Sequence, residues 1–534
     1  MIKNRFNWKF LFLTLFIVCL YFFTRFQNIL AIPVFGDEAI YIRWSQVMKS
    51  VESLRFLPLT DGKQPLFMWV TIAFLKFIND PLLAGRLVSL FAGLLSLISI
   101  YLSTIILLNY KSKQKEPLSF INQSFEKHKY SALLSSFLYL TSTYTFFFDR
   151  LALPDNLLSA LVSLSFFIFL LLIKYPRLDL TLILAANLGI AWLTKSPALY
   201  FVLISSTILL LRSLKNKVYL IFAFLNILIS YSIYNILRLG PQFQQIALRN
   251  KDYIHPFSEI LKHPLDPLKP HLWDTQVLYS LFINPQVILT LLLSLILIVF
   301  LKNKDKSSKN KTNSGSKLLS FLQLNLHCLA LIAWFLAPLL ATAVFVKVFT
   351  ARYILFTLAP LLILLTLCYL YLISLLKANY KKYLIILILL LQTPSLLLIY
   401  KLSVDPFNVK LPSTESGYLQ DWTSGWGIKE ATEYLISRSK EANVILGTEG
   451  YFGTLPDAAQ AYANQVPRLT IFGVGQEFTT IPEKLIDAHN HGDEVYLLIN
   501  KSRNKLIPSE LEKLKIIKEY SKPGNDQLVL YLLI

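Results

Sequence analysis

The chain of 534 residues is 54% hydrophobic and only 16% charged, whereas soluble proteins are roughly 45–50% apolar and about 25% charged, so a purely soluble protein is excluded. The formal charge of +20 does not indicate a nucleic-acid partner, because Lys and Arg occur in short groups between apolar stretches rather than on one basic face. With 17 glycines and 3 cysteines, a collagen-like chain and a disulfide-stapled scaffold are also excluded.

Apolar stretches long enough to cross about 30 Å of hydrocarbon predict a multi-pass α-helical membrane protein with about eleven transmembrane helices. The first stretch is a retained anchor, because no small-residue cleavage site follows it. The apolar stretch 66–78 is too short to span and is predicted to be an interfacial helix. The predicted spans begin near Trp8, Leu82, Tyr130, Asn156, Leu180, Pro197, Val218, Leu278, Leu318, Tyr353 and Leu384.

Lys and Arg collect in alternate loops, as they do in the cytoplasmic loops of multi-pass membrane proteins. This pattern predicts that the chain spans the cytoplasmic membrane several times, with its N-terminus in the cytoplasm. The polar segment 302–317 is then a cytoplasmic loop, for which no regular structure is predicted. The segments 33–81, 149–155, 238–276 and 347–352 then face outward, so we look for chemistry there.

The chain divides into a transmembrane module, 1–400, and an extracytoplasmic α/β domain, 401–534. In the second part acidic residues increase and strand-like runs appear, with a helical pattern at 428–440. The glycines of 424–430 predict a turn and a helix start rather than a phosphate loop, since no strand precedes them. The predicted strands are 443–449, 468–474, 495–500 and 527–534.

Two neighbouring carboxylates, Asp37 and Glu38, open an amphipathic helix predicted over 36–50. In one interpretation Asp37 caps this helix and Glu38 complements its dipole. In the other, one of them is a general base. Adjacent helical side chains diverge by about 100°, so a matched acid/base pair on one substrate atom is not predicted.

Further charged residues lie at the predicted outer ends of spans. Each cation could be an interfacial anchor, but four outward sites that combine cations and carboxylates favour an anionic substrate group at the outer leaflet. The histidines at 255, 263 and 271 do not have a metal-ligand spacing, so no metal ligand is predicted. These outward groups are Lys63, Asp149, Arg150, Asp155, Lys195, Arg352 and Tyr353.

Several segments together resemble the GT-C fold membrane glycosyltransferases, in particular the protein O-mannosyltransferase and aminoarabinose-transferase group. The C-terminal segments 422–435 and 446–458 also look like the extracytoplasmic tail of bacterial relatives. The segments that carry the resemblance, in family order, are DEAIY (37–41), KQPL (63–66), RLVSLFAG (86–93), RLALPD (150–155), LTK (193–195) and the Arg-Tyr pair at 352.

The resemblance implies transfer of a sugar, mannose-like, from a polyprenyl-phosphate donor to an acceptor hydroxyl outside the cytoplasmic membrane. Asp37 matches the residue assigned as base. The resemblance leaves open whether the acceptor is a protein, a lipid or a cell-wall glycan. It also leaves open whether a divalent cation assists the reaction. The residues expected near the donor and the rest of the substrate are Glu38, Lys63, Arg150, Asp155, Lys195, Arg352 and Tyr353.

One departure concerns the neighbours of Lys63. The aminoarabinose transferases tend to carry a glutamate before this lysine and two prolines after it, whereas Gly62 precedes it here and Gln64-Pro65 follows. Asp61 is a candidate substitute for that glutamate.

Two other classes of protein would also explain many spans. A transporter or polyprenyl-lipid flippase should show paired repeats or broken helices with ionisable residues at mid-membrane, and the sequence shows neither. A sensor or assembly scaffold should tolerate replacement of Asp37 and Lys63. An outward-facing transferase fits better, because its donor must be lipid-carried and its phosphate leaving group needs cations rather than a proton.

Overall fold

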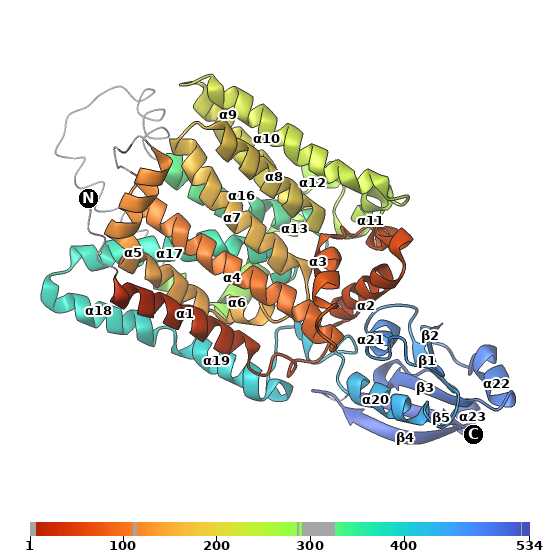
Figure 1. Cartoon of the computed structure of the whole chain (residues 1–534). Helices are drawn as coiled ribbons and strands as arrows, with labels where there is room; N and C mark the ends of the chain where they lie inside the picture. Colours follow the sequence, from red (N-terminus) through yellow and green to blue (C-terminus); the bar gives the residue numbers. More distant parts are fainter. Residues whose placement is uncertain (1–6, 111–113, 115, 286–287, 291–325, 525) are drawn as a thin grey trace.

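The computed structural model describes residues 7–110, 114, 116–285, 288–290, 326–524 and 526–534. These residues form a bundle of long apolar helices with a smaller α/β unit at one end, as the sequence predicts (Figure 1). The bundle helices are α1 (Trp8–Phe26), α4 (Pro81–Leu108), α5 (Pro117–Thr141), α6 (Thr143–Phe148), α7 (Pro154–Lys174), α8 (Leu178–Thr194), α9 (Ala198–Ser213), α10 (Val218–Tyr234), α13 (Leu265–Phe282), α16 (Leu326–Phe345), α17 (Leu358–Leu375), α18 (Ala378–Leu390) and α19 (Thr393–Val404).

By length and composition, seven helices of the described part are apolar enough to cross a membrane. Two shorter apolar helices, α8 and α9, coincide with two more predicted spans. The span predicted near Tyr130 falls on α5, which begins earlier, at Pro117. The loop 302–317 lies outside the described residues, and so do parts of the spans predicted near Leu278 and Leu318.

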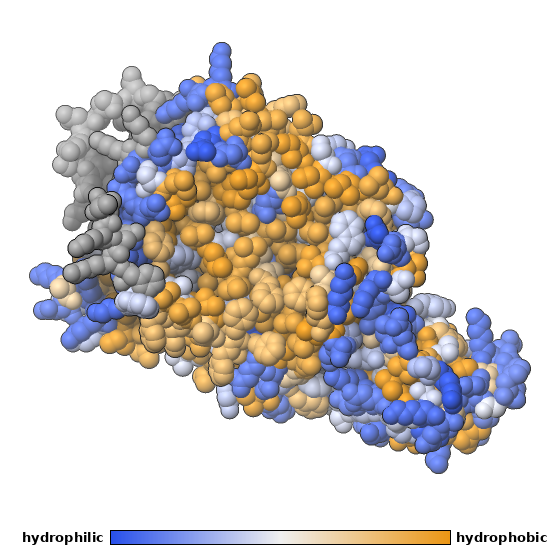
Figure 2. Space-filling model, in the orientation of Figure 1, coloured by the Kyte–Doolittle hydropathy of each residue, from blue (hydrophilic) through white to orange (hydrophobic). Residues whose placement is uncertain are grey.

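The sides of the helix bundle have an apolar surface, as is typical of a membrane protein that contacts lipid. Figure 2 shows a broad hydrophobic band across the helices, with hydrophilic residues at both ends and over the C-terminal unit. Exposed large hydrophobic side chains of the bundle helices include Phe12 in α1, Phe91 in α4, Leu211 in α9 and Phe224 in α10. Such an extended apolar surface is stable only in contact with lipid or another apolar partner.

Short helices cover the end of the bundle that adjoins the C-terminal unit (Figure 1). The helix predicted over 36–50 is present with those bounds, and the stretch 66–78 contains a separate nine-residue helix. These short elements are α2 (Gly36–Ser50), η1 (Glu52–Leu54), η2 (Leu57–Asp61), α3 (Leu66–Phe74), η3 (Asn235–Leu239), α11 (Gln245–Tyr253), α12 (Phe257–Lys262) and η4 (Ala351–Thr357).

The C-terminal unit is built on a mixed sheet with the strand order β2-β1-β3-β5-β4. The central strand pairs are parallel, and β5 runs antiparallel to its two neighbours. The four predicted strands and the helix at 428–440 are confirmed, with small shifts at their ends. Its elements are β1 (Val444–Glu449), β2 (Leu469–Gly475), β3 (Glu494–Asn500), β4 (Leu514–Ser521), β5 (Gln527–Leu533), α20 (Ile428–Arg438), α21 (Thr454–Tyr462), α22 (Glu483–Asn490) and α23 (Pro508–Leu511), with short 3-10 turns η5 (Pro406–Asn408), η6 (Ser416–Tyr418) and η7 (Lys501–Arg503).

Strand β4 is absent from the prediction. It is an edge strand of the sheet, and five of its eight residues are exposed, four of them charged or polar. Edge strands often carry charged side chains, which prevent pairing with other chains and also remove the apolar alternation that identifies a strand.

The C-terminal unit rests on the segment between α1 and α4. Gln46 Nε2 donates to the Ala461 carbonyl at 2.9 Å, and Arg43 Nη1 donates to Asn464 Oδ1 at 2.9 Å, so α2 is bonded directly to the end of α21 and the residues after it. Residues 35 and 424 form an isolated antiparallel bridge. The unit is therefore positioned against the same helix that carries Asp37.

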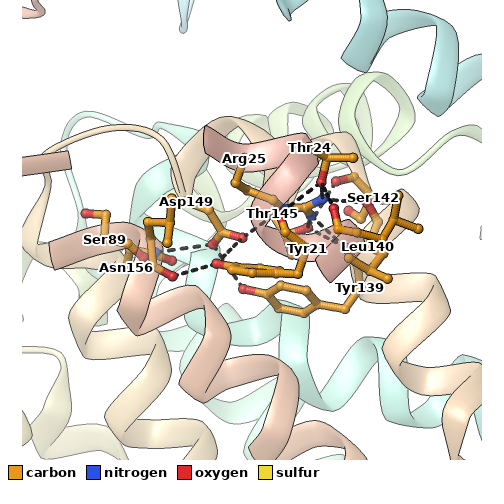
Figure 3. A network of polar contacts seen from close by, with 12 residues as sticks. Tyr21, Thr24, Arg25, Ser89, Tyr139, Leu140, Ser142, Thr145, Asp149 and Asn156 are labelled. Atoms are coloured by element: carbon orange, nitrogen blue, oxygen red, sulfur yellow. Dashed lines mark hydrogen bonds and ion pairs between the residues drawn. The ribbon is translucent and has the colours of Figure 1, made fainter. Parts of the chain in front are cut away.

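A buried polar network joins the ends of α1, α5 and α7 around Asp149 (Figure 3). Asp149 Oδ1 accepts from the Tyr139 hydroxyl at 3.0 Å and from Asn156 Nδ2 at 3.2 Å. Its Oδ2 accepts from the Tyr21 hydroxyl at 3.3 Å and pairs with Arg25 at 3.4 Å. The turn 149–155, predicted at the outer ends of its spans, is buried within the protein, and this network fixes its start.

Candidate functional site

A cavity of about 310 Å³ lies at the end of the bundle that adjoins the C-terminal unit. The start of α2, the residues after η2, the turn between α8 and α9, α11 and η4 supply its walls. Six of the residues named from the sequence line it: Asp37, Asp61, Lys63, Lys195, Arg352 and Tyr353.

Asp37 and Arg352 form an ion pair at one wall of this cavity. Arg352 Nη1 donates to Asp37 Oδ2, and both side chains are largely buried. Burial alone would raise the pKa of Asp37, but Arg352 and Lys63 lower it below its usual value. Asp37 is therefore ionised at neutral pH.

Asp37 does not cap α2, so that interpretation is wrong. The N-cap residue is Phe35, and its backbone amide donates to Glu38 Oε2 at 3.0 Å. Asp37 is the second residue of the helix, and its carboxylate turns toward Arg352 instead.

Glu38 points away from the cavity into the protein. Its carboxylate accepts from Arg86 Nε at 2.9 Å and Nη2 at 2.8 Å, and from the Ala152 amide at 2.6 Å. Glu38 and Arg86 are both fully buried. The divergence of adjacent helical positions thus separates the two carboxylates, and the structure does not bring Glu38 to the substrate site for which we selected it.

Arg150 also lies away from the cavity. Its guanidinium donates to the carbonyls of Gln27 and Asn28 and to Ser403 Oγ, and it stacks 4.6 Å from the Phe146 ring. These contacts connect the end of α1 to α19. The geometry shows a packing contact rather than the substrate contact that we expected.

Lys195 enters the cavity with Asp155 behind it. Lys195 is the residue that follows α8, and its Nζ lies 2.5 Å from Asp155 Oδ1 in the first turn of α7. Its Nζ also lies 4.5 Å from the centre of the Tyr353 ring. Asp155 is nearly fully buried, so it orients the lysine rather than forming part of the wall.

Lys63 belongs to a second charged group that lines the cavity. Its Nζ is 3.5 Å from Asp61 Oδ2 and 5.5 Å from the centre of the Tyr253 ring. Burial lowers the pKa of Lys63, but Asp37, Tyr253 and Asp61 together raise it above its usual value. Arg249 pairs with the same Asp61 carboxylate.

Arg249 and Tyr253 are cavity residues that the sequence analysis missed. They lie four residues apart in α11, on one face of the helix, within the segment 238–276 that we placed outside. Their four-residue spacing is the feature from which the sequence analysis could have identified them. Gly62 explains the departure beside Lys63: it has φ +68°, and a Cβ there would lie 2.8 Å from the Arg249 Cβ.

The cavity wall has excess positive charge. Four cations line it against two carboxylates, while Asp155 pairs with Lys195 from behind the wall and the exposed Asp252 pairs with Arg249. Such a site attracts an anion, because desolvated cations bind phosphate or carboxylate through charge-assisted hydrogen bonds. The cations are Lys63, Lys195, Arg249 and Arg352, and the lining carboxylates are Asp37 and Asp61.

The histidines of the segment 238–276 lie elsewhere, beside α12 and α13. His255 faces Glu259 and His263 faces Asp266, each at 3.6 Å, while His271 Nδ1 lies 2.8 Å from the Ala343 carbonyl. Within the part of the chain that the structure describes, no group of three or more His, Cys, Asp or Glu side chains is placed to hold a metal ion.

No family model and no curated protein matches this sequence. The fold does match solved structures. ArnT from Cupriavidus metallidurans bound to undecaprenyl phosphate aligns over 99% of both chains with a TM-score of 0.55 and 12% identity. The apo form of the same protein aligns over 99% of this chain and 98% of its own, with a TM-score of 0.54 and 12% identity.

A second protein is similar over most of its length. The archaeal oligosaccharyltransferase AglB from Archaeoglobus fulgidus, in complex with an inhibitory peptide and a dolichol-phosphate, aligns over 98% of this chain and 74% of its own, with a TM-score of 0.53 and 11% identity. Both proteins have the GT-C fold. The likeness shows that this chain has the GT-C fold too.

Proposed function

We propose that this chain is a membrane glycosyltransferase that moves a sugar from a polyprenyl-phosphate donor to an acceptor hydroxyl at the outer face of the cytoplasmic membrane. The observation that carries the proposal is the cavity at the polar end of an apolar bundle, where four cations and two carboxylates, Asp37 and Asp61, line the wall. Phosphate in this cavity would leave the polyprenyl tail in hydrocarbon. The GT-C fold, which ArnT and AglB share, supports the same kind of chemistry.

The chemistry follows from the ion pair. A donor phosphate that pairs with Arg352 would compete with Asp37 for the guanidinium, and loss of that pairing raises the basicity of the carboxylate. Asp37 then takes the proton of the acceptor hydroxyl while the hydroxyl oxygen attacks the anomeric carbon of the sugar. The bond from that carbon to the phosphate oxygen breaks, and its electron pair leaves with the polyprenyl phosphate.

The remaining groups have distinct proposed roles. Lys63, Lys195 and Arg249 stabilise the charge on the departing phosphate, so no acid is needed. Direct displacement at one face of the sugar inverts the anomeric centre. Tyr353 lies against Lys195 and forms part of the sugar site, while Glu38 and Arg150 hold the surrounding helices.

Replacement of Lys63 by Gln tests the phosphate site. We expect affinity for undecaprenyl phosphate to fall roughly 10- to 100-fold, because a charge-assisted contact contributes about 1.5–3 kcal/mol. The measurement is titration of the purified protein with the lipid. Lys429→Gln is the matched control, because Lys429 also pairs with an aspartate, Asp80 at 3.0 Å, but outside the cavity. Equal affinity of wild type and Lys63→Gln would contradict this phosphate site.

Cysteine labelling in intact cells tests the proposed orientation. In a background without the three native cysteines, Ser437→Cys should react with a membrane-impermeant reagent, because the proposal places α20 outside. Asn216→Cys, in the turn between α9 and α10, should react only after the cells are opened. Both positions are exposed in the structure. The reverse labelling pattern would place the cavity on the cytoplasmic side.

A further inference from the structure

Glu415 belongs to the segment that leads into the C-terminal sheet, yet it is buried against the bundle with 1% of its surface exposed. Its Oε1 accepts from the Ala351 backbone amide at 2.7 Å. Ala351 is the first residue of η4 and directly precedes Arg352. The C-terminal unit therefore bonds to the backbone that carries the arginine of the ion pair.

The first amide of a helical turn has no partner within the helix, and a buried amide without a partner is costly. Ala351 is fully buried, so Glu415 supplies the partner that the helix cannot. The Ala351 carbonyl is held from the other side, where it accepts from the Tyr144 hydroxyl of α6 at 2.5 Å. The position of Arg352 thus depends on a carboxylate from a distant part of the chain.

The same segment also holds the start of α2. The Tyr418 ring lies 4.3 Å from the Phe35 ring, and Ser424 forms a bridge with Phe35. Phe35 is the N-cap residue of α2, two residues before Asp37, and its ring lies 5.7 Å from the Arg352 guanidinium. Both members of the ion pair therefore start from backbone that contacts residues 415–424.

We propose that residues 415–424, here called the clamp segment, position Asp37 and Arg352 relative to each other, with Glu415 as the positioning residue for Arg352. The effect on donor binding rests on the proposed function, whereas the effect on η4 does not. In this proposal the C-terminal unit contributes to the geometry of the cavity and is not an independent appended domain. Glu415 touches neither the cavity nor, by this account, the substrate.

Hydrogen exchange of the full-length protein without ligand tests the clamp directly. The exchange of the Ala351 amide is measured in a peptide that spans η4. In Glu415→Ala we expect this amide to exchange at least roughly tenfold faster than in the wild type, because its hydrogen-bond acceptor is lost. Glu415→Gln keeps an acceptor oxygen and should restore protection. Glu510→Ala is the matched control, because Glu510 accepts from the Ile481 amide at 3.1 Å within the same unit but far along the chain from η4.

A binding measurement then tests whether the clamp acts through Arg352. Glu415→Ala should weaken affinity for undecaprenyl phosphate about tenfold in the wild-type background, and have no further effect once Arg352 is replaced by Gln. Glu415→Leu, which fills the same volume without an acceptor, replaces Glu415→Ala if that variant does not fold. Unchanged exchange in η4, or an equal loss of affinity in both backgrounds, would overturn the clamp.

The two proposals fail in different ways. If the wild-type protein does not bind undecaprenyl phosphate, the proposed donor is wrong, but the exchange experiment still decides whether Glu415 holds η4. If the wild type binds the lipid and Glu415→Ala binds it equally well, the clamp is wrong and the proposed function stands.

Discussion

Asp37→Asn is expected to slow sugar transfer roughly 10²–10⁴-fold, the range by which general base catalysis contributes. Asn has nearly the same size and can still accept a hydrogen bond from Arg352, but it cannot take a proton. Affinity for undecaprenyl phosphate should not fall, because the change removes a negative charge from a site that binds an anion. The measurement is the transfer rate at saturating donor beside the affinity for the lipid.

The matched control is Asp80→Asn. Asp80 is a similarly buried carboxylate of the same segment, 33–81, and it also pairs with a cation, Lys429. It caps α4 by accepting from the Leu83 amide at 3.0 Å, and Asn caps helices about as well as Asp. Asp80→Asn should therefore transfer sugar at a rate near that of wild type. Normal turnover of Asp37→Asn would refute Asp37 as the base.

Glu38→Ala should produce the opposite result, a loss of stability rather than of chemistry. Removal of one partner from a buried ion pair leaves an uncompensated charge, which costs about 3–5 kcal/mol. Arg86 would be that charge, because it is fully buried beside Glu38. The measurement is the unfolding free energy of the purified protein in detergent.

Two further variants make this result interpretable. Glu52→Ala removes the partner of Arg55 at 3.2 Å, but both side chains are mostly exposed, so the loss should be about 0–1 kcal/mol. Replacement of both Glu38 and Arg86 by Met should recover much of the lost stability, because no unpaired charge remains. If Glu38→Ala were as stable as wild type, the pair would not be a structural element.

The sequence predicts the parts of this protein that depend on local pattern. Span starts such as Leu82 and Val218, the bounds of α2 and four of the five strands follow from apolar length and periodicity. Lys195 and Arg352 could be selected as site residues from the sequence because both lie at predicted outer ends of spans. Such ends meet at one end of a helix bundle, however the helices pack against each other.

The rest depends on tertiary pairing, which pattern does not encode. Asp37 and Glu38 are adjacent and similar, and only the positions of Arg352 and Arg86 make one a cavity residue and the other a core residue. Glu415 lies in a short polar stretch with no distinguishing feature, so its contact with the Ala351 amide could not be predicted.

The most direct test of the central claim is incubation of the purified full-length protein with labelled polyprenyl-phosphate sugars and a cell-envelope extract. The account predicts that label leaves the lipid for an acceptor hydroxyl, with inversion at the anomeric carbon, and that Asp37→Asn abolishes most of this transfer. If the protein binds the lipids but moves no sugar from any of them, or if it only carries the intact lipid across a bilayer, the glycosyltransferase account is contradicted.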